Sequence, residues 1–146
     1  MTEHHGSDSH PVDIIVGVPP LEDAIALYNS VGWSAYTRDT AQLKRALEGS
    51  TRVVHARRAG QLIGVARVLT DGEVIAYLQD ILVRPEHQGG GMGRRLVAVA
   101  LEPYAHVRQT VLLTDTDPGQ RAFYAALGFT EVRDHQPPLR AFVRLR

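Results

Sequence analysis

Apolar positions along this chain follow two periods, one of about two residues and one of about 3.6 residues. Leu21, Ala24, Ile25 and Tyr28, for example, share one face of a helix. The pattern predicts helices over residues 21–28, 40–47 and 92–101, and a fourth that Asp117 caps and Gly128 ends. It predicts strands over residues 13–18, 53–58, 62–69, 74–83 and 111–113, and a final strand pair over 129–133 and 139–145.

The order of these elements predicts the fold class. Strands in a run, then a helix that crosses over to further strands, indicate a mixed sheet covered by helices. A length of 146 residues with 44% apolar content suits one globular domain. We therefore expect a disordered polar tail over residues 1–10 and a single domain over residues 11–146.

Composition and charge exclude several classes of function. Lys and Arg together number 16, as do Asp and Glu, so nothing indicates a nucleic-acid binder. The chain has no cysteine, which excludes disulfides, thiolate metal sites and a cysteine nucleophile. Three histidines, His4, His5 and His10, could bind a metal, but on a polar tail we interpret them as incidental and expect no metal site. No apolar run reaches transmembrane length or forms a signal-peptide core, so we expect no membrane partner and a cytoplasmic location.

The strongest local signal is the segment Gln88-Gly89-Gly90-Gly91-Met92-Gly93, which lies between a predicted strand and a predicted helix. Glycines at such a turn let a ligand approach the backbone, and the first helical N–H groups attract an anion. A nucleotide-hydrolase loop needs a second glycine followed by Lys-Ser/Thr, and Arg94 and Arg95 stand in that region instead. The dinucleotide spacing Gly-x-Gly-x-x-Gly also fails.

The spacing that fits is Gln/Arg-x-x-Gly-x-Gly/Ala, read as Gln88, Gly91 and Gly93. With its flanking residues, and with Phe123-Tyr124-Ala125-Ala126-Leu127-Gly128-Phe129 downstream, the chain resembles the GCN5-related N-acetyltransferase (GNAT) family. The resemblance implies an α/β (α+β) domain with a mixed, mostly antiparallel sheet flanked by helices. It further implies that the strands over 74–83 and 111–114 splay apart and admit the pantetheine arm of acetyl-coenzyme A (acetyl-CoA).

The same resemblance implies the residues that hold the cofactor. Backbone groups of Leu82 and Val83 are expected to meet the pantetheine. The pyrophosphate is expected among Gln88, Gly89, Gly90, Gly91, Met92, Gly93 and Arg94. Where many members carry a cofactor-binding asparagine, this chain has Asp117, followed by Pro118. A carboxylate near phosphate is unfavourable, so we interpret Asp117 as a helix cap only.

Transfer of an acetyl group to an amine needs a proton acceptor, an oxyanion site and a group that holds the leaving thiolate. Without a cysteine, direct attack by the amine in a ternary complex is favoured over an acetyl-cysteine route. Tyr124 matches the family position of a general acid; the alternative is that it only packs. Asp80, which follows Gln79 in an otherwise apolar strand, is a candidate base or amine anchor; the alternative is a structural carboxylate.

Two aromatic residues near the predicted N-terminal helices are candidates for the acceptor site. Trp33 and Tyr36 lie in a segment that joins two predicted helices, and they are candidates for an acceptor wall or for a cover of the core. The acceptor is expected to be a primary amine, either on a small molecule or on a peptide. Three alternatives remain: a non-catalytic acyl-CoA sensor, a transferase with another acyl donor or an oxygen acceptor, and a nucleotide-binding module. A homodimer joined through exposed strands is compatible with the sequence.

Overall fold

The computed structural model describes residues 10–146, so the predicted tail lies outside the described residues apart from His10. The chain forms two compact units, the first ending at Leu112 and the second spanning Leu113–Arg146.

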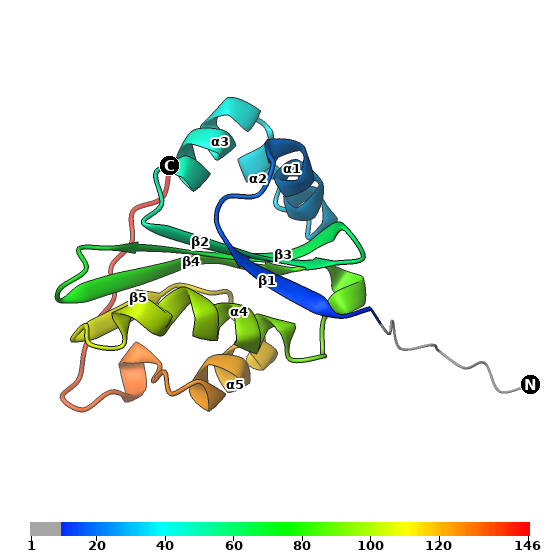
Figure 1. Cartoon of the computed structure of the whole chain (residues 1–146). Helices are drawn as coiled ribbons and strands as arrows, with labels where there is room; N and C mark the ends of the chain where they lie inside the picture. The colour runs from blue at the N-terminus through cyan, green and yellow to red at the C-terminus, as the bar shows by residue number, and fades with distance from the viewer. Residues whose placement is uncertain (1–9) are drawn as a thin grey trace, which may run out of the picture. The chain divides into compact units, whose positions relative to one another are not determined.

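The first unit is built on one five-stranded sheet. Its strands are β1 (Val12–Val16), β2 (Arg52–Arg58), β3 (Gln61–Thr70), β4 (Ile75–Val83) and β5 (Gln109–Leu112). They lie side by side in the order of the chain, β1 to β4 antiparallel and β5 parallel to β4 (Figure 1). The predicted mixed, mostly antiparallel sheet is confirmed.

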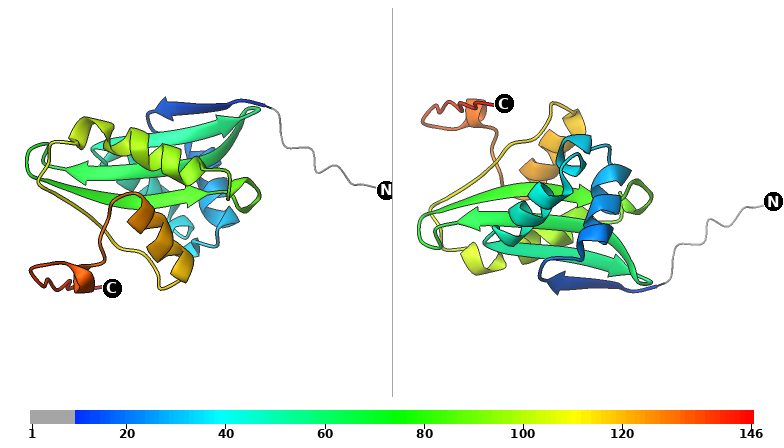
Figure 2. Two further views of the ribbon diagram at one scale, coloured as in Figure 1. Left: turned by 90° about the horizontal axis from the view of Figure 1, so that it is seen from below. Right: turned by 90° about the horizontal axis from the view of Figure 1, so that it is seen from above.

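Helices cover both faces of this sheet. One face carries α1 (Leu21–Ser30), α2 (Ser34–Thr37) and α3 (Thr40–Glu48), and the other carries α4 (Met92–Leu101) (Figures 1 and 2). Short 3₁₀ turns at Pro85–His87 and Glu102–Tyr104 flank α4 on the chain. The sequence pattern did not predict α2, which is a single turn. None of the helices within residues 10–146 is long and apolar enough to span a lipid bilayer.

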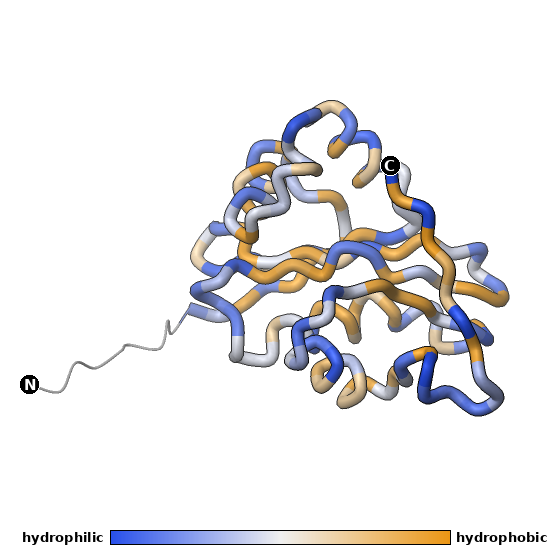
Figure 3. Tube along the Cα trace, turned by 180° about the vertical axis from the view of Figure 1, so that it is seen from behind, coloured by the Kyte–Doolittle hydropathy of each residue, from blue (hydrophilic) through white to orange (hydrophobic). Residues whose placement is uncertain are grey.

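Most of the apolar positions that predicted α1, α3 and α4 become buried, while Leu21 and Ile25 are partly buried. On α4 the buried positions are Met92, Leu96, Val97 and Ala100. On the opposite face, α1 and α3 bury a cluster with the sheet: Ala24, Leu27, Tyr28, Leu43, Leu47, Val53, Leu62, Val65 and Leu82. The strands between these two layers are accordingly the most hydrophobic stretches of the trace (Figure 3). Burial of one face of each helix is what fixes the helices on the sheet.

Tight turns join β2 to β3 and β3 to β4. Ala59 and Gly60 have φ angles of 50° and 78°, the left-handed pair that a two-residue hairpin requires between β2 and β3. At the β3–β4 turn the carboxylate of Asp71 accepts N–H groups from Glu73, Val74 and Ile75 at 2.9, 2.9 and 3.1 Å. These backbone hydrogen bonds lower the pKa of Asp71.

The second unit contains α5 (Pro118–Ala126), and Asp117 caps it by accepting the N–H of Gly119 at 2.8 Å, as predicted. The predicted strand pair over 129–133 and 139–145 is wrong, because these residues form a 3₁₀ turn (Val132–Asp134) and irregular backbone. Ion pairs from Arg121 to Glu131 and Asp134 hold the first segment as a turn. Pro137 and Pro138 supply no N–H to a strand ladder.

Candidate functional site

The glycine loop between β4 and α4 exposes its backbone. Gly89 and Gly91 have φ angles of 85° and 81°, a conformation that L side chains rarely adopt. A Cβ built on Gly89, Gly90 or Gly91 would meet no atom within 4 Å. A larger side chain at these three positions would therefore not clash with the rest of the protein. The left-handed backbone favours glycine at Gly89 and Gly91. The close approach of a ligand would explain glycine at Gly90.

The first turn of α4 is arranged for an anion. Gly91 caps the helix without a side chain, so no side-chain oxygen accepts from the N–H groups of the first turn. That turn carries no acidic residue but exposes Arg94 and Arg95. Basic side chains oppose the positive end of the helix dipole, typically at a cost of about 0.3–1 kcal/mol each. A bound anion would convert that cost into attraction.

Hydrogen bonds hold the β4 side of the loop to the sheet. The Gln88 side-chain amide donates to the Val83 carbonyl at 2.9 Å. Arg84 donates its backbone N–H to Ile63 and its Nε to the carbonyl of Leu62, both at 2.8 Å. The predicted cofactor segment thus starts from a rigid strand end. The Met92 side chain is buried, so this residue presents only its backbone at the loop surface.

The free edge of β4 lies directly before this loop. β5 pairs with β4 from Ile75 to Leu78 and pairs with none of the β4 residues that follow. Among the described residues, Gln79 to Val83 therefore have no strand partner on that side, which is the predicted splay. Leu82 and Val83 lie in this stretch. The Leu82 side chain is buried against α1 and α3, so only its backbone is available at the edge.

Asp80 occupies an unusual point on the same strand. Between the pairs Val65–Leu82 and Arg67–Gln79, β4 has one residue more than β3, which is a β-bulge. Asp80 lies in this bulge with a φ angle of 58°, a left-handed conformation that Asp and Asn tolerate better than most side chains. The bulge places the side chains of Gln79 and Asp80 within hydrogen-bonding distance of each other.

The Asp80 carboxylate is buried and surrounded by donors. Oδ1 accepts from the Tyr36 hydroxyl and from Gln79 Nε2, both at 2.9 Å. Oδ2 accepts from the Tyr28 hydroxyl at 2.9 Å and from Arg67 Nε at 2.7 Å. We call these five residues the Asp80 cluster. Burial, and then the charge of Asp80, raises the pKa of both tyrosines, so they remain protonated donors.

The sequence pattern does not predict Tyr28, Arg67 and Gln79 as partners of Asp80. A signal was present, because Arg67 interrupts one apolar strand of the hairpin and Gln79-Asp80 interrupts the other. Counting outward from a two-residue Asp71-Gly72 turn places Arg67 opposite Ala76, whereas the actual connection spans residues 71–75 and pairs Arg67 with Gln79. No comparable signal connects the helix tyrosines with Asp80.

Trp33 and Tyr36 lie side by side at the Asp80 cluster. Their rings stack with centroids 5.7 Å apart, and the Tyr28 ring packs against both. Trp33 is 37% exposed, whereas Tyr28 is completely buried. The two sequence interpretations, a cover of the core and a wall open to an acceptor, both fit this geometry, since one side of the stack meets the core and Trp33 reaches the surface.

Tyr124 belongs to the second unit. On α5 its ring contacts Phe123 and Phe129 edge to face, with centroids 4.9 and 5.9 Å away. Burial, with a smaller effect from the charge of Asp115, raises the pKa of Tyr124 to about 12. The phenol therefore keeps its proton at neutral pH, which a proton or hydrogen-bond donor requires.

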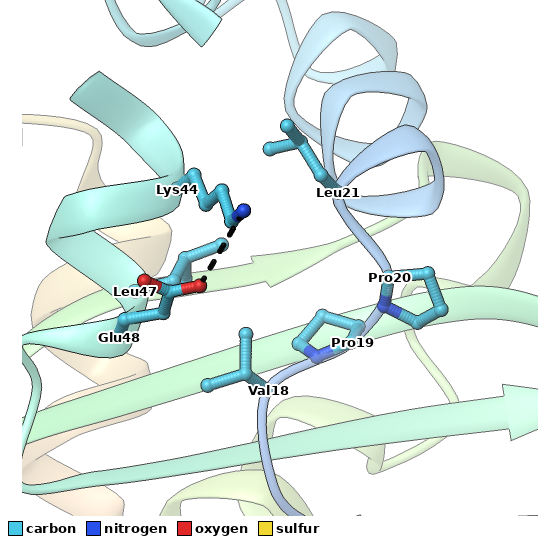
Figure 4. Close-up of a pocket in the computed structure, with 7 residues that line it drawn as sticks. All are labelled: Val18, Pro19, Pro20, Leu21, Lys44, Leu47 and Glu48. Atoms are coloured by element: carbon cyan, nitrogen blue, oxygen red, sulfur yellow. Dashed lines mark ion pairs between the residues drawn. The ribbon is translucent and has the colours of Figure 1, made fainter. Parts of the chain in front are cut away.

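A hollow of about 390 Å³ lies between the β1–α1 connection and α3 (Figure 4). Its lining is Val18, Pro19, Pro20, Leu21, Lys44, Leu47 and Glu48. The two charged side chains lie one helical turn apart and form an exposed pair at 4.0 Å. None of the predicted site residues lines this hollow, and it offers no group for acetyl transfer.

Comparison with known proteins bears on both units. The family model described as an acetyltransferase (GNAT) domain matches residues 20–138. An acetyltransferase of the GNAT family from Streptococcus pneumoniae has a solved structure that superposes with a TM-score of 0.80. It is 26% identical, and the match covers 93% of this chain and 98% of that one.

Curated relatives agree on the family. A Gibberella zeae protein named as an acetyltransferase is 33% identical over 112 residues, 75% of this chain and 60% of the relative. An uncharacterized ycf52-like N-acetyltransferase of Prochlorococcus marinus is 32% identical over 71% of this chain and 59% of its own length. The chain thus spans about three fifths of the curated relatives that it matches. With the glycine loop, the bulged β4 and the sheet order already established, these matches show that the chain belongs to the GNAT family of acetyltransferases.

Proposed function

We propose that this chain transfers an acetyl group from acetyl-CoA to a primary amine. The observation that supports this most is the continuous surface made by the unpaired edge of β4 and the left-handed glycine loop. Strand-edge backbone groups suit the amide-rich pantetheine arm, and the uncapped start of α4 suits the pyrophosphate. Leu82 and Val83 would hold the first, and Gln88 to Arg94 the second.

In the proposed reaction the unprotonated amine nitrogen attacks the thioester carbonyl within a ternary complex. The new C–N bond forms, the C–S bond breaks, the amine proton leaves to a base, and the CoA thiolate acquires a proton. We propose Tyr124 as the donor to this thiolate. Because its pKa is about 12, well above the roughly 8.5 of an alkyl thiol, it acts first as a hydrogen-bond donor to the developing negative charge.

From the sequence, Asp80 is a candidate base or amine anchor, and the geometry of its carboxylate sets a condition on the role of base. The carboxylate can take a proton only after one of its four donors has moved away. The acceptor, whether a small-molecule amine or a peptide amine, and its contact with Trp33 and Tyr36 also remain proposals. The homodimer and the cytoplasmic location predicted from the sequence stay predictions.

Calorimetry with acetyl-CoA tests the proposal, using Gly91→Ala and a matched control. Gly91 and Gly60 have φ angles of 81° and 78°, and a Cβ on either would meet nothing within 4 Å. Both substitutions therefore cost about the same 1–2 kcal/mol of backbone strain. Acetyl-CoA affinity should fall at least tenfold in Gly91→Ala and stay unchanged in Gly60→Ala. A wild-type chain that does not bind acetyl-CoA would refute the proposal.

Release of free thiol in the presence of a panel of amines then separates the transferase from the acyl-CoA sensor. The transferase gives amine-dependent thiol release that Tyr124→Phe slows. Tight binding of acetyl-CoA without turnover on small amines, aminoglycosides and peptides would favour the sensor.

A further inference from the structure

The carboxylate of Asp80 has no acceptor capacity left. An ionised carboxylate offers about four lone-pair positions. Tyr36 and Gln79 occupy those of Oδ1, and Tyr28 and Arg67 occupy those of Oδ2. The side chain is 0% exposed, and a guanidinium lies 2.7 Å from Oδ2. A base in this position would have to lose a donor and then hold a proton beside a positive charge.

The backbone of Asp80 has an equally specific role. The left-handed residue forms the bulge of β4, just after the strand has lost its β5 partner. Conformations of this kind are strained and persist only where surrounding contacts hold them. Here the contacts come from three directions, since Arg67 lies on β3, Tyr28 on α1 and Tyr36 on α2.

We infer that Asp80 is a positioning residue of the acetyl-transfer site and that the amine proton goes to another acceptor. The carboxylate holds the bulge, and the bulge sets the direction of the free β4 edge that leads to Leu82 and Val83. Through Tyr36 the same carboxylate fixes the Trp33 stack. The inference rests on the proposed function, because it assigns a role at that same site.

Tyr36 is the member that connects the cluster with the surface. Its hydroxyl donates to Asp80 and accepts from Gln79 Nε2, and its ring stacks on the exposed Trp33. The buried carboxylate of Asp80 thereby connects the aromatic pair proposed to contact the acceptor with the unpaired β4 edge proposed to bind the acyl donor.

The test compares two neutral replacements of the ion pair. Asp80→Asn alone would leave the Arg67 guanidinium buried without a counter-charge, and the resulting loss of stability would obscure any effect on the rate. Each variant at position 80 is therefore combined with Arg67→Gln. Asn still tolerates the left-handed backbone conformation and retains one acceptor oxygen, whereas Ala does neither. The pair D80N/R67Q is the conservative variant and D80A/R67Q the disruptive one.

For a positioning residue, kcat/KM of D80N/R67Q should stay within about tenfold of the wild type, and its pH profile should keep the acid limb. D80A/R67Q should lose at least a further tenfold. If D80N/R67Q is folded but loses the acid limb together with 10²-fold or more in rate, about the contribution of a general base, Asp80 is the base and the inference is overturned. Equal activity of the two variants would also overturn it.

A readout that needs no turnover separates this inference from the proposed function. The chain contains a single tryptophan, Trp33, so its fluorescence reports on the stack alone. Its emission should shift in D80A/R67Q and remain as in the wild type in D80N/R67Q. If the wild type does not turn over acetyl-CoA but these spectra behave as stated, the proposed function fails while the link from Asp80 to Trp33 stands. Identical spectra in all three proteins would overturn the link.

Discussion

Gly64→Ala should destabilise the protein although its backbone conformation suits any residue. Gly64 lies on β3 beneath α4, and a Cβ there would come 2.8 Å from Leu96 Cδ1 and 3.0 Å from the carbonyl oxygen of Leu82. The first distance is about 0.7 Å short of the ~3.5 Å at which carbon atoms attract. Leu96 is fully buried, so it cannot move outward without displacing α4.

The expected cost is that of one methyl group forced into a packed core, about 1–3 kcal/mol. For a chain of this size that corresponds to a decrease in Tm of about 3–9 °C, measured by calorimetry or circular dichroism. Leu96→Val removes the clashing atom, so the double variant should be more stable than the sum of the two single changes predicts, by about 0.5 kcal/mol or more.

Two results would refute this reasoning. If Gly64→Ala were as stable as the wild type, α4 would be able to shift away from β3 without a measurable loss of stability. Strict additivity with Leu96→Val would mean that the destabilisation has another source. Because α4 carries the glycine loop, Gly64→Ala should also weaken acetyl-CoA binding, whereas Leu96→Val should restore part of it.

Three further predictions concern single side chains. His55 is buried, its Nδ1 lies 2.8 Å from the carbonyl of Gly17, and burial lowers its pKa below 6.5. The unfolded chain therefore takes up the proton more readily, so urea midpoints should fall as the pH drops below 6.5, and less steeply in His55→Asn. Tyr124→Phe should lower kcat about 10²-fold without changing the Kd of acetyl-CoA. With a pKa of about 12, wild-type Tyr124 should cause no loss of kcat between pH 8 and 10, so a loss there that Tyr124→Phe abolishes would contradict this value. Asp71→Ala should lower Tm, because three N–H groups lose their acceptor.

The sequence predicted the first unit well because its signals are local. Helix α4 begins and ends at Met92 and Leu101 as predicted, since a glycine turn precedes it and four buried positions repeat along it. The turn at Asp71-Gly72 is likewise determined by its own residues. The contiguous loop from Gln88 to Arg94 could be identified for the same reason.

The features that the sequence did not predict depend on contacts between residues far apart in the chain. The segment over 139–145 has strand-like composition, but a strand also needs a partner, and composition cannot show whether one is present. The environment of Asp80 depends on a one-residue bulge that brings together side chains 13, 44 and 52 residues away. A polar residue in an apolar strand indicated that Asp80 is special, but not that four donors already surround it.

The Asp80 cluster also has a consequence for the evolution of this family branch. Loss of Asp80 leaves buried hydroxyl, amide and guanidinium donors without their acceptor, and loss of Tyr28 or Arg67 leaves the buried carboxylate without one of its donors. Single substitutions at positions 28, 67 and 80 should therefore be rare among viable descendants. Apolar residues become tolerable at positions 67 and 80 only when both members of the ion pair are replaced together. Positions 67 and 80 should therefore covary in an alignment of close homologues, with intermediate states poorly represented.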